Sequence, residues 1–401
     1  TLRSTSPNIL GWSATGSGSG GQGWYDLALA VDPTNKNRIF AGGVNVWSSN
    51  DGGGQWTCVG HWYGQNGVPV VHADIHYFTW QPGSNDLYIG TDGGVYETTN
   101  SGSSFIPYKD GMNITQYYKI SQSLSNPTLI LGGAQDNGTH RQQGANWSII
   151  RGGDGMDNGI DPDNNQIMYA SVYYGDFTKS TNGGNSFFPM NSLTVAGQGN
   201  WVTPFLIDPA NSNIIYAGFD RLWRSNNKGV TWNATSSNVV GNGNIDDIAV
   251  APSNNQILYV AINENLYRSG NNGSSWSLIS QGMPGSSHIT GIAVSSINPD
   301  HVWVSRTGYA QNHKVFETTD AGQSWTNLTG NLPNLPVNCV VYEDNSLDGV
   351  YIGTDVGVYY RDATMSDWAP YMTGLPNVIV NDLEIYYADK KIRAGTYGRG
   401  R

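Results

Sequence analysis

The chain is 401 residues long and contains 52 glycines, 14 tryptophans and 23 tyrosines, but only 20 lysines and arginines together. Its formal net charge of −11 argues against nucleic acid and anionic membrane surfaces as partners, because both require a basic face. No apolar run reaches the roughly 18 residues of a membrane-spanning helix, so we expect no membrane insertion. Glycines and aromatic residues among clusters of Asn, Asp and Ser instead favour short strands joined by tight turns.

An eight-residue phrase recurs along the chain with the pattern Ser/Thr-x-Asp/Asn-x-Gly-x-x-Trp/Phe. Its clearest copies span 49–56 and 318–325, and two eroded copies end at Trp147 and Trp368. The eight closing aromatic residues are Trp56, Phe105, Trp147, Phe187, Trp232, Trp276, Trp325 and Trp368. A period of about 40–50 residues is typical of proteins built from radial or stacked repeats.

Each repeat predicts four short strands. In the repeat around residue 260, the strands are expected at 247–251, 257–261, 266–269 and 275–279, and the phrase at 269–276 turns the third strand into the fourth. Four antiparallel strands per repeat, arranged radially, form a β-propeller. Complete repeats are predicted, in chain order, at about 26–59, 73–108, 116–150, 156–190, 202–235, 246–280, 290–328 and 337–371.

A ninth repeat begins at about residue 380 and supplies two strands without the phrase. The first residues, 1–6, have the character of a fourth strand just past a phrase. Pairing these two ends would close the ring and remove its open edges. The sequence therefore predicts an all-β fold, a single β-propeller domain over 1–401, with nine blades and a last blade built from N- and C-terminal strands. Eight blades, with one terminus outside the ring, is the alternative.

The acidic or amide position of the phrase is predicted to be structural. A Ser/Thr hydroxyl and an Asp/Asn side chain can accept hydrogen bonds from turn N–H groups, while Gly supplies the left-handed backbone. The residues concerned are Asp51, Asn100, Asn182, Asn227, Asn271 and Asp320.

The phrases resemble the Asp boxes (BNR repeats) of a family of β-propellers. The segments 88–96 and 351–359 and the ending 393–401 are most similar to the sortilin/xyloglucanase-like branch, as in secreted Bacteroidetes surface proteins. This resemblance implies a secreted or cell-surface location, a longer multidomain chain, and a polysaccharide or glycoprotein partner. It covers nearly the whole chain but is specific for fold rather than function.

Two departures narrow the choice among relatives. The chain lacks the Arg-Ile-Pro type of segment, and few arginines occupy loops, so it does not resemble a sialidase in its site. A xyloglucanase of this family implies two seven-bladed propellers, nearly twice the present length, whereas 401 residues leave room for one ring.

Several aspartates are predicted in turns that gather on one face of a propeller. Asp92, Asp136 and Asp355 follow second strands, and Asp154 precedes a first strand. Two such carboxylates could form the acid/base pair of a glycoside hydrolase, about 5–5.5 Å apart in retaining enzymes and about 6.5–9.5 Å apart in inverting ones. The alternative is that each Asp only caps its own turn, which is common beside glycine.

The segment 72–76 places His72, Asp74 and His76 at alternate positions, which share one face in a strand. The outer two are about 13 Å apart in an extended strand, so all three cannot bind one ion. Asp74 and His76 are the candidate metal ligands, with a hydrogen-bond network as the alternative. No cofactor is required by the sequence. Calcium at the oxygen-rich segment 161–165 is an open alternative, although the spacing of a calcium loop is missing.

Aromatic residues accompany these aspartates in long connections and turns. Sugar rings stack on aromatic faces and hydrogen-bond to carboxylates, so the combination is typical of carbohydrate sites; packing between blades is the alternative. The candidates for ligand binding are Trp24, Trp62, Tyr63, Tyr174 and Tyr397.

Three functions stay open at this point. The first is a binding module that recognises glycan or protein through its Asp/aromatic face. The second is a xyloglucanase-like glycoside hydrolase with a pair of aspartates. The third is a structural spacer within a larger adhesin. The single-ring length favours binding, while the Thr-Asp-Gly-Gly phrase at 91–94 favours hydrolysis.

Overall fold

A computed structural model describes residues 2–108, 111–236 and 240–399. The contacts within the chain divide it into two compact units, Thr1–Asn113 (unit 1) and Ile114–Arg401 (unit 2). The described residues form eight four-stranded antiparallel sheets and one two-stranded sheet, so the all-β, four-stranded design expected from the repeats is confirmed. No described helix has the length and apolar character needed to span a bilayer.

Unit 1 contains two sheets, in the orders β1-β2-β3-β4 and β5-β6-β7-β8. Their strands are β1 (Ala28–Val31), β2 (Ile39–Gly42), β3 (Val46–Ser49), β4 (Thr57–Gly60), β5 (Ile75–Trp80), β6 (Leu87–Thr91), β7 (Gly94–Thr98) and β8 (Ile106–Tyr108), and the 3-10 helix η1 (Gln65–Gly67) follows β4. The sheets share one apolar core, in which Phe40 and Ile75 are buried.

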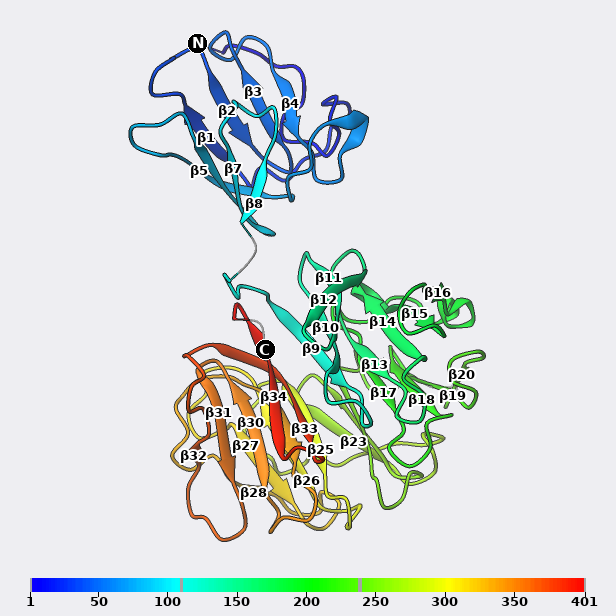
Figure 1. The fold of residues 1–401 in the computed structure, drawn as a ribbon. Helices are drawn as coiled ribbons and strands as arrows, with labels where there is room; N and C mark the ends of the chain where they lie inside the picture. The colour runs from blue at the N-terminus through cyan, green and yellow to red at the C-terminus, as the bar shows by residue number, and fades with distance from the viewer. Residues whose placement is uncertain (1, 109–110, 237–239, 400–401) are drawn as a thin grey trace. The chain divides into compact units, whose positions relative to one another are not determined.

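Unit 2 contains the other seven sheets (Figure 1). The first three use β9 (Tyr117–Gln122), β10 (Leu129–Ala134), β11 (Gly138–Gln143), β12 (Asn146–Arg151), β13 (Asn158–Ile160), β14 (Met168–Val172), β15 (Asp176–Ser180), β16 (Phe188–Pro189), β17 (Phe205–Ile207), β18 (Ile215–Gly218), β19 (Leu222–Ser225) and β20 (Asn233–Ala234), with 3-10 helices η2 (Tyr173–Gly175) and η3 (Asn191–Ala196). The others use β21 (Asp247–Val250), β22 (Leu258–Ile262), β23 (Asn265–Ser269), β24 (Ser277–Leu278), β25 (Ile289–Val294), β26 (Val302–Arg306), β27 (Val315–Thr318), β28 (Thr326–Asn327), β29 (Val337–Tyr342), β30 (Val350–Thr354), β31 (Gly357–Arg361), β32 (Ala369–Pro370), β33 (Ile379–Tyr386) and β34 (Lys391–Tyr397).

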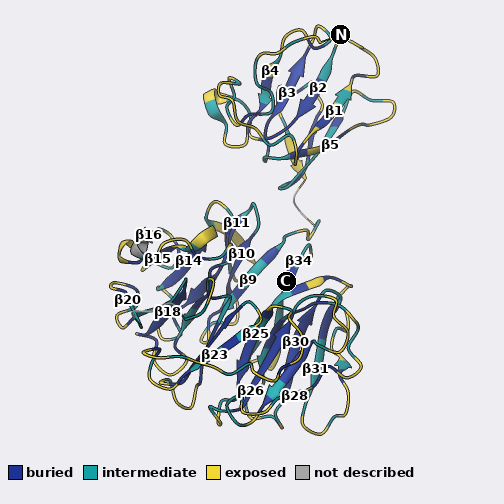
Figure 2. Cartoon of the chain, turned by 180° about the vertical axis from the view of Figure 1, so that it is seen from behind, coloured by how far each residue is buried: buried dark blue, intermediate teal, exposed yellow. Residues whose placement is uncertain are grey.

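Burial explains the strand sequences. The second strand of a four-stranded sheet lies between two neighbours and packs on both faces, so it is a continuous apolar run. Every residue is buried in β22 and in β30, the latter labelled in Figure 2. The fourth strands are short and mostly exposed, as in β24 and β28. Short outer strands limit the open edges that would otherwise pair with other chains.

The Asp boxes close the turns between third and fourth strands. In each predicted box the Asp or Asn side chain accepts a hydrogen bond from the backbone N–H four residues later, at 2.8–3.0 Å; the acceptors are Asp51, Asn100, Asn182, Asn227, Asn271 and Asp320. The eroded copy at Trp147 differs, because β11 and β12 meet in a tight hairpin in which Gln143 faces Asn146.

Unit 2 closes on itself through its innermost strands. The contacts run in order through β9, β13, β17, β21, β25, β29 and β33, and β33 contacts β9 again. Strands from the two ends of unit 2, β9 in cyan and β33 in red, therefore complete a ring of seven sheets (Figure 1). Nine repeats are present in the described chain, and seven of them form this ring.

Side chains at the start of the inner strands join neighbouring sheets. Asp157 accepts the N–H of Phe205 at 2.9 Å, and Asp247 accepts that of Ile292 at 2.8 Å. Each bond links one inner strand to the next around the ring. These aspartates therefore have a structural role between sheets.

The predicted completion of the last blade by residues 1–6 would pair unit 1 with unit 2 and stays a prediction. Residues 2–6 contain no strand, Thr1 lies outside the described part, and β33 and β34 form a two-stranded sheet. The Arg3 side chain donates to the Gly52 carbonyl at 3.2 Å, so this segment lies along the box turn of the first sheet of unit 1.

Candidate functional site

A network of carboxylates lies where β5 begins in unit 1. The Gln22 amide donates to Asp74 Oδ1 at 2.5 Å and to Asp26 Oδ2 at 3.3 Å. Asp26 is fully buried, and its Oδ1 has no hydrogen-bond partner among the described residues. Burial, and then the charges of Asp26 and Asp92, raise the pKa of Asp74 to about 7. The Asp74 carboxyl is therefore partly protonated at neutral pH, beside the buried carboxyl of Asp26.

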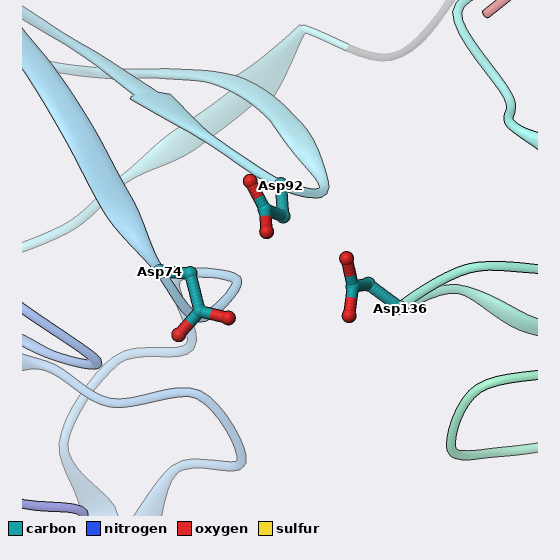
Figure 3. A group of neighbouring side chains, drawn as sticks. All are labelled: Asp74, Asp92 and Asp136. Atoms are coloured by element: carbon teal, nitrogen blue, oxygen red, sulfur yellow. The ribbon is translucent and has the colours of Figure 1, made fainter. Parts of the chain in front are cut away.

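Asp92 occupies the turn between β6 and β7, as expected from the repeat pattern. Its Oδ2 accepts the Tyr25 hydroxyl at 2.7 Å, and its Oδ1 lies 2.8 Å from His76 Nε2. Tyr25 meets the His76 ring edge-on, with centroids 5.0 Å apart. Carboxylate oxygens of Asp74 and Asp92 lie within 4.8 Å of each other (Figure 3). Unit 1 thus combines two carboxyls, an imidazole and a phenol.

The strand alignment expected for His72, Asp74 and His76 is wrong. β5 begins at Ile75, and Asp74 has a left-handed backbone with φ 66°. This turn breaks the alternation on which a shared face depends. An aspartate with a left-handed backbone directly before a strand is a strained position, of the kind that clusters at binding sites. Asp74 and His76 both approach Asp92, and metal binding by them stays a prediction.

We expect the free energy of unfolding to fall as pH rises from about 4 to about 7. The folded pKa of Asp74, about 7, exceeds its usual value of 3.8, so the folded chain holds a proton that the unfolded chain releases in this window. Asp74→Asn removes this dependence, so its stability relative to wild type should increase with pH. Urea unfolding at pH 4.5, 6 and 8 measures the effect; a constant difference at all three values would contradict it.

The candidate aspartates of unit 2 are engaged locally. Asp154 Oδ1 accepts the backbone N–H of Asp136 at 2.8 Å, and Asp136 itself has φ 57°. Asp355 Oδ1 accepts the Asn338 amide at 3.1 Å. Asp154 therefore caps the turn that holds Asp136, and not its own turn as the structural alternative expected. Figure 3 draws Asp136 as a third carboxylate, and it belongs to unit 2.

A cavity of about 550 Å³ opens at the inner strands of unit 2. Its wall includes Tyr118, Asp246, His288, Thr307, Asn338 and Tyr397. The Asp246 carboxylate accepts the Asn200 amide at 2.6 Å and the Asn263 N–H at 2.5 Å, and burial raises its pKa. A concave wall with a few fixed polar groups is the general form of a small-ligand site.

Aromatic rings stand beside this cavity. Trp201 Nε1 donates to the Tyr118 hydroxyl at 3.1 Å, which ties Trp201 to the cavity wall. Tyr173 stacks on Trp201 with centroids 5.3 Å apart and planes at 10°. Tyr174 meets Trp201 edge-on and has φ 61°, a rare conformation for a bulky residue. Tyr118 and Tyr397 both donate to Gln135 Oε1.

The aromatic candidates of unit 1 are exposed in connections, as their loop positions indicate. Trp24 is almost wholly exposed, and Trp62 and Tyr63 meet edge-on with centroids 4.5 Å apart. No ligand contact is established for any of them. Two site residues had no sequence signal. Gln22 donates to Asp74, and His288 lines the cavity of unit 2, only because distant segments of the chain fold next to them.

Comparison with known proteins shows which folds this chain resembles. Residues 220–348 match the family model Sortilin, neurotensin receptor 3 (Sortilin-Vps10). No curated protein matches the sequence. An ancestral GH74 enzyme has a similar structure, with TM-score 0.54 and 18% identity over 64% of this chain and 38% of that one. This chain therefore spans well under half the length of that enzyme.

Two further structures are more distant. The GH74 enzyme of Niastella koreensis has TM-score 0.41 and 16% identity over 94% of this chain and 74% of its own. YCF48, in a structure titled as bound to D1 peptide, has TM-score 0.46 and 13% identity over 70% and 90%. The family-model match and the structure of the ancestral GH74 enzyme support a β-propeller fold similar to those of sortilin and GH74 proteins, and they leave function open.

Proposed function

We propose that this chain is a secreted or cell-surface binding module that recognises glycans through unit 2. The observation that carries the proposal is the stacked pair Tyr173 and Trp201, exposed beside a polar cavity and anchored to it through Tyr118. A sugar ring can lie on the outer face of an exposed aromatic pair while its hydroxyls reach the polar groups of the cavity. Asp154 already accepts the Asp136 N–H and Asp355 already accepts the Asn338 side-chain amide, which favours binding over catalysis in this unit.

We expect Trp201→Ala to weaken glycan binding at least about fivefold, because stacking on an exposed ring contributes about 1–3 kcal/mol in comparable base-stacking sites. Phe188→Ala is the matched control, since Phe188 is an exposed aromatic residue on the outer strand β16. A glycan array with plant and algal polysaccharides identifies the ligand, and calorimetry measures both variants. Equal affinity of Trp201→Ala and wild type would contradict the proposal.

A second function, glycoside hydrolysis, is favoured by one specific observation in unit 1. Asp74 carries a raised pKa of about 7 and lies within 4.8 Å of Asp92 by oxygen distance. A protonated carboxyl beside a second carboxyl is the arrangement of an acid and its partner in retaining enzymes. Against this role, both Asp92 oxygens already accept hydrogen bonds.

Reducing-sugar release on the polysaccharides bound in the array separates the two functions. Release that is lost in Asp92→Asn but retained in Trp201→Ala would establish hydrolysis by unit 1. Binding without release supports the binding module. Neither binding nor release would leave recognition of a protein partner or a structural spacer as the remaining functions.

A further inference from the structure

The cavity at the inner strands of unit 2 has a wall on which negative charge predominates. Its described residues include two carboxyls, Asp246 and Asp247, whereas Lys119 is their only lysine or arginine. The Lys119 ammonium lies 3.4 Å from Asp382 Oδ1, so a third carboxylate already compensates its charge. The carboxyls of the wall therefore outnumber the cation that could neutralise them.

Asp246 is the carboxylate of this wall that neutral donors hold in place. Its Oδ1 accepts the Asn200 side-chain amide at 2.6 Å, and its Oδ2 accepts the Asn263 backbone N–H at 2.5 Å. These amides orient the carboxylate without neutralising it, and each oxygen can accept a further hydrogen bond. Among the described residues, Asp246 forms no ion pair with a lysine or arginine, and burial raises the pKa of its carboxyl although a charge on His288 acts in the opposite direction. A cation on a ligand would stabilise this carboxylate.

The same aspartate is linked to the aromatic pair beside the cavity. Asn200, whose amide it accepts, directly precedes Trp201 in the chain, and the Thr203 hydroxyl donates to the Asn200 carbonyl at 2.8 Å. Trp201 stacks on Tyr173, as described above. Successive Cα atoms are about 3.8 Å apart, so this short segment brings the carboxylate and the stacked rings within the span of one short oligosaccharide.

The charge of the wall discriminates among classes of glycan. A uronic acid or a sulfated sugar would bring a negative charge next to Asp246 and Asp247, and like charges across an interface are unfavourable. A neutral hydroxyl can donate to Asp246, but an ammonium donates to it through a charge-assisted hydrogen bond, which is roughly twice as strong. An N-acetyl group keeps an N–H donor and removes the positive charge. A free amino group is therefore the substituent that this wall favours most.

We propose that the cavity of unit 2 selects glycans that contain a hexosamine with a free amino group. The ammonium of the sugar binds the Asp246 carboxylate, while a neighbouring ring of the same glycan stacks on Trp201 and Tyr173. This inference rests on the glycan-binding function proposed above and names the class of ligand. Glycans rich in uronic acid or sulfate are excluded by the same negative wall that binds the amine.

Two trimers of identical linkage provide the test, β-1,4-linked glucosamine and β-1,4-linked N-acetylglucosamine, because they differ only in the acetyl groups that remove the charge. At pH 6.5 and low ionic strength, we expect calorimetry to show at least tenfold tighter binding of the glucosamine trimer to the intact chain. The preference should shrink in about 0.5 M NaCl, since salt screens the attraction between ammonium and carboxylate. Equal affinities, or tighter binding of the acetylated trimer, would overturn this inference and leave glycan binding itself intact.

Variants locate the preference and separate it from a general attraction of cations to an acidic protein. Asp246→Asn keeps a side-chain acceptor but removes the charge, so it should abolish the preference for the glucosamine trimer while retaining the affinity for the acetylated one. Asp367→Asn, at an exposed carboxylate outside the cavity, is the matched control and should retain the full preference. A preference reduced equally by both substitutions would overturn the assignment to this cavity.

Failure of this inference is distinguishable from failure of the proposed function. Trp201→Ala should weaken the binding of both trimers, whereas Asp246→Asn should weaken only that of the charged one. Binding of other glycans in the array, with neither trimer bound, would overturn the preference for amines alone. Binding of no glycan at all would overturn the proposed function and this inference together.

Discussion

Replacing Trp368 by alanine is expected to lower the free energy of unfolding by about 3–5 kcal/mol, the range for large aromatic residues removed from a core. Trp368 is 2% exposed and packs with Trp303, Val315 and Val350. Its indole N–H donates to the Leu328 carbonyl, which would lose this donor. The loss therefore combines a cavity with an unsatisfied polar group.

Urea unfolding followed by circular dichroism measures this effect, with Trp147→Ala as the matched control. Trp147 closes the other eroded box but is 43% exposed and stacks loosely on Tyr117, with centroids 6.4 Å apart. Its removal should cost no more than about 1 kcal/mol. Equal losses for the two variants would mean that burial of the closing tryptophan does not determine its contribution.

The second large effect concerns the closure of the ring in unit 2. Asp382 Oδ2 accepts the Ile120 N–H at 2.8 Å, and its Oδ1 lies 3.4 Å from Lys119 Nζ, so one side chain on β33 holds β9 in two ways. Asp382 raises the pKa of Lys119 above its usual value. Asn381 adds a third link by donating to the Tyr117 carbonyl at 2.9 Å.

Asp382→Ala is expected to cost about 2–3 kcal/mol, because it leaves the Lys119 ammonium and the Ile120 N–H without their acceptor. This loss is smaller than the about 3–5 kcal/mol of a wholly buried pair, because the Lys119 side chain is 31% exposed. Asp389→Ala removes an exposed ion pair with Lys391 and should change stability by less than about 1 kcal/mol. Urea unfolding followed by circular dichroism compares Asp382→Ala and Asp389→Ala with wild type. A loss for Asp382→Ala no greater than that for Asp389→Ala would show that this contact does not hold the ring closed.

The Asp boxes were predictable because their interactions are local. In the box that ends at Trp276, for example, Asn271 accepts the Ser275 N–H and Ser269 accepts the Gly273 N–H, all within seven residues of chain. Such turns depend little on the rest of the fold. The burial of second strands such as β22 was equally predictable from the sequence, because a short run of consecutive apolar residues is typical of a strand buried on both faces.

The candidate sites were only partly predictable. The turn that carries Asp92 follows from the repeat, but its partners Tyr25 and His76 come from other parts of unit 1. Asp154 looked like a catalytic candidate from its glycine-rich context, yet it accepts the N–H of Asp136, eighteen residues earlier. Sequence spacing does not report which distant group reaches a carboxylate, so neither assignment could be made from the pattern.

The sequence by itself determined the repeating unit: four short strands, a capped turn, and an aromatic residue that packs in the core shared with the preceding sheet. Only the tertiary structure decided how many units close a ring and where it closes. Closure depends on contacts such as that of Asp382 with Ile120, which are 262 residues apart. Nothing in the sequence around either residue distinguishes it from other residues of the strands.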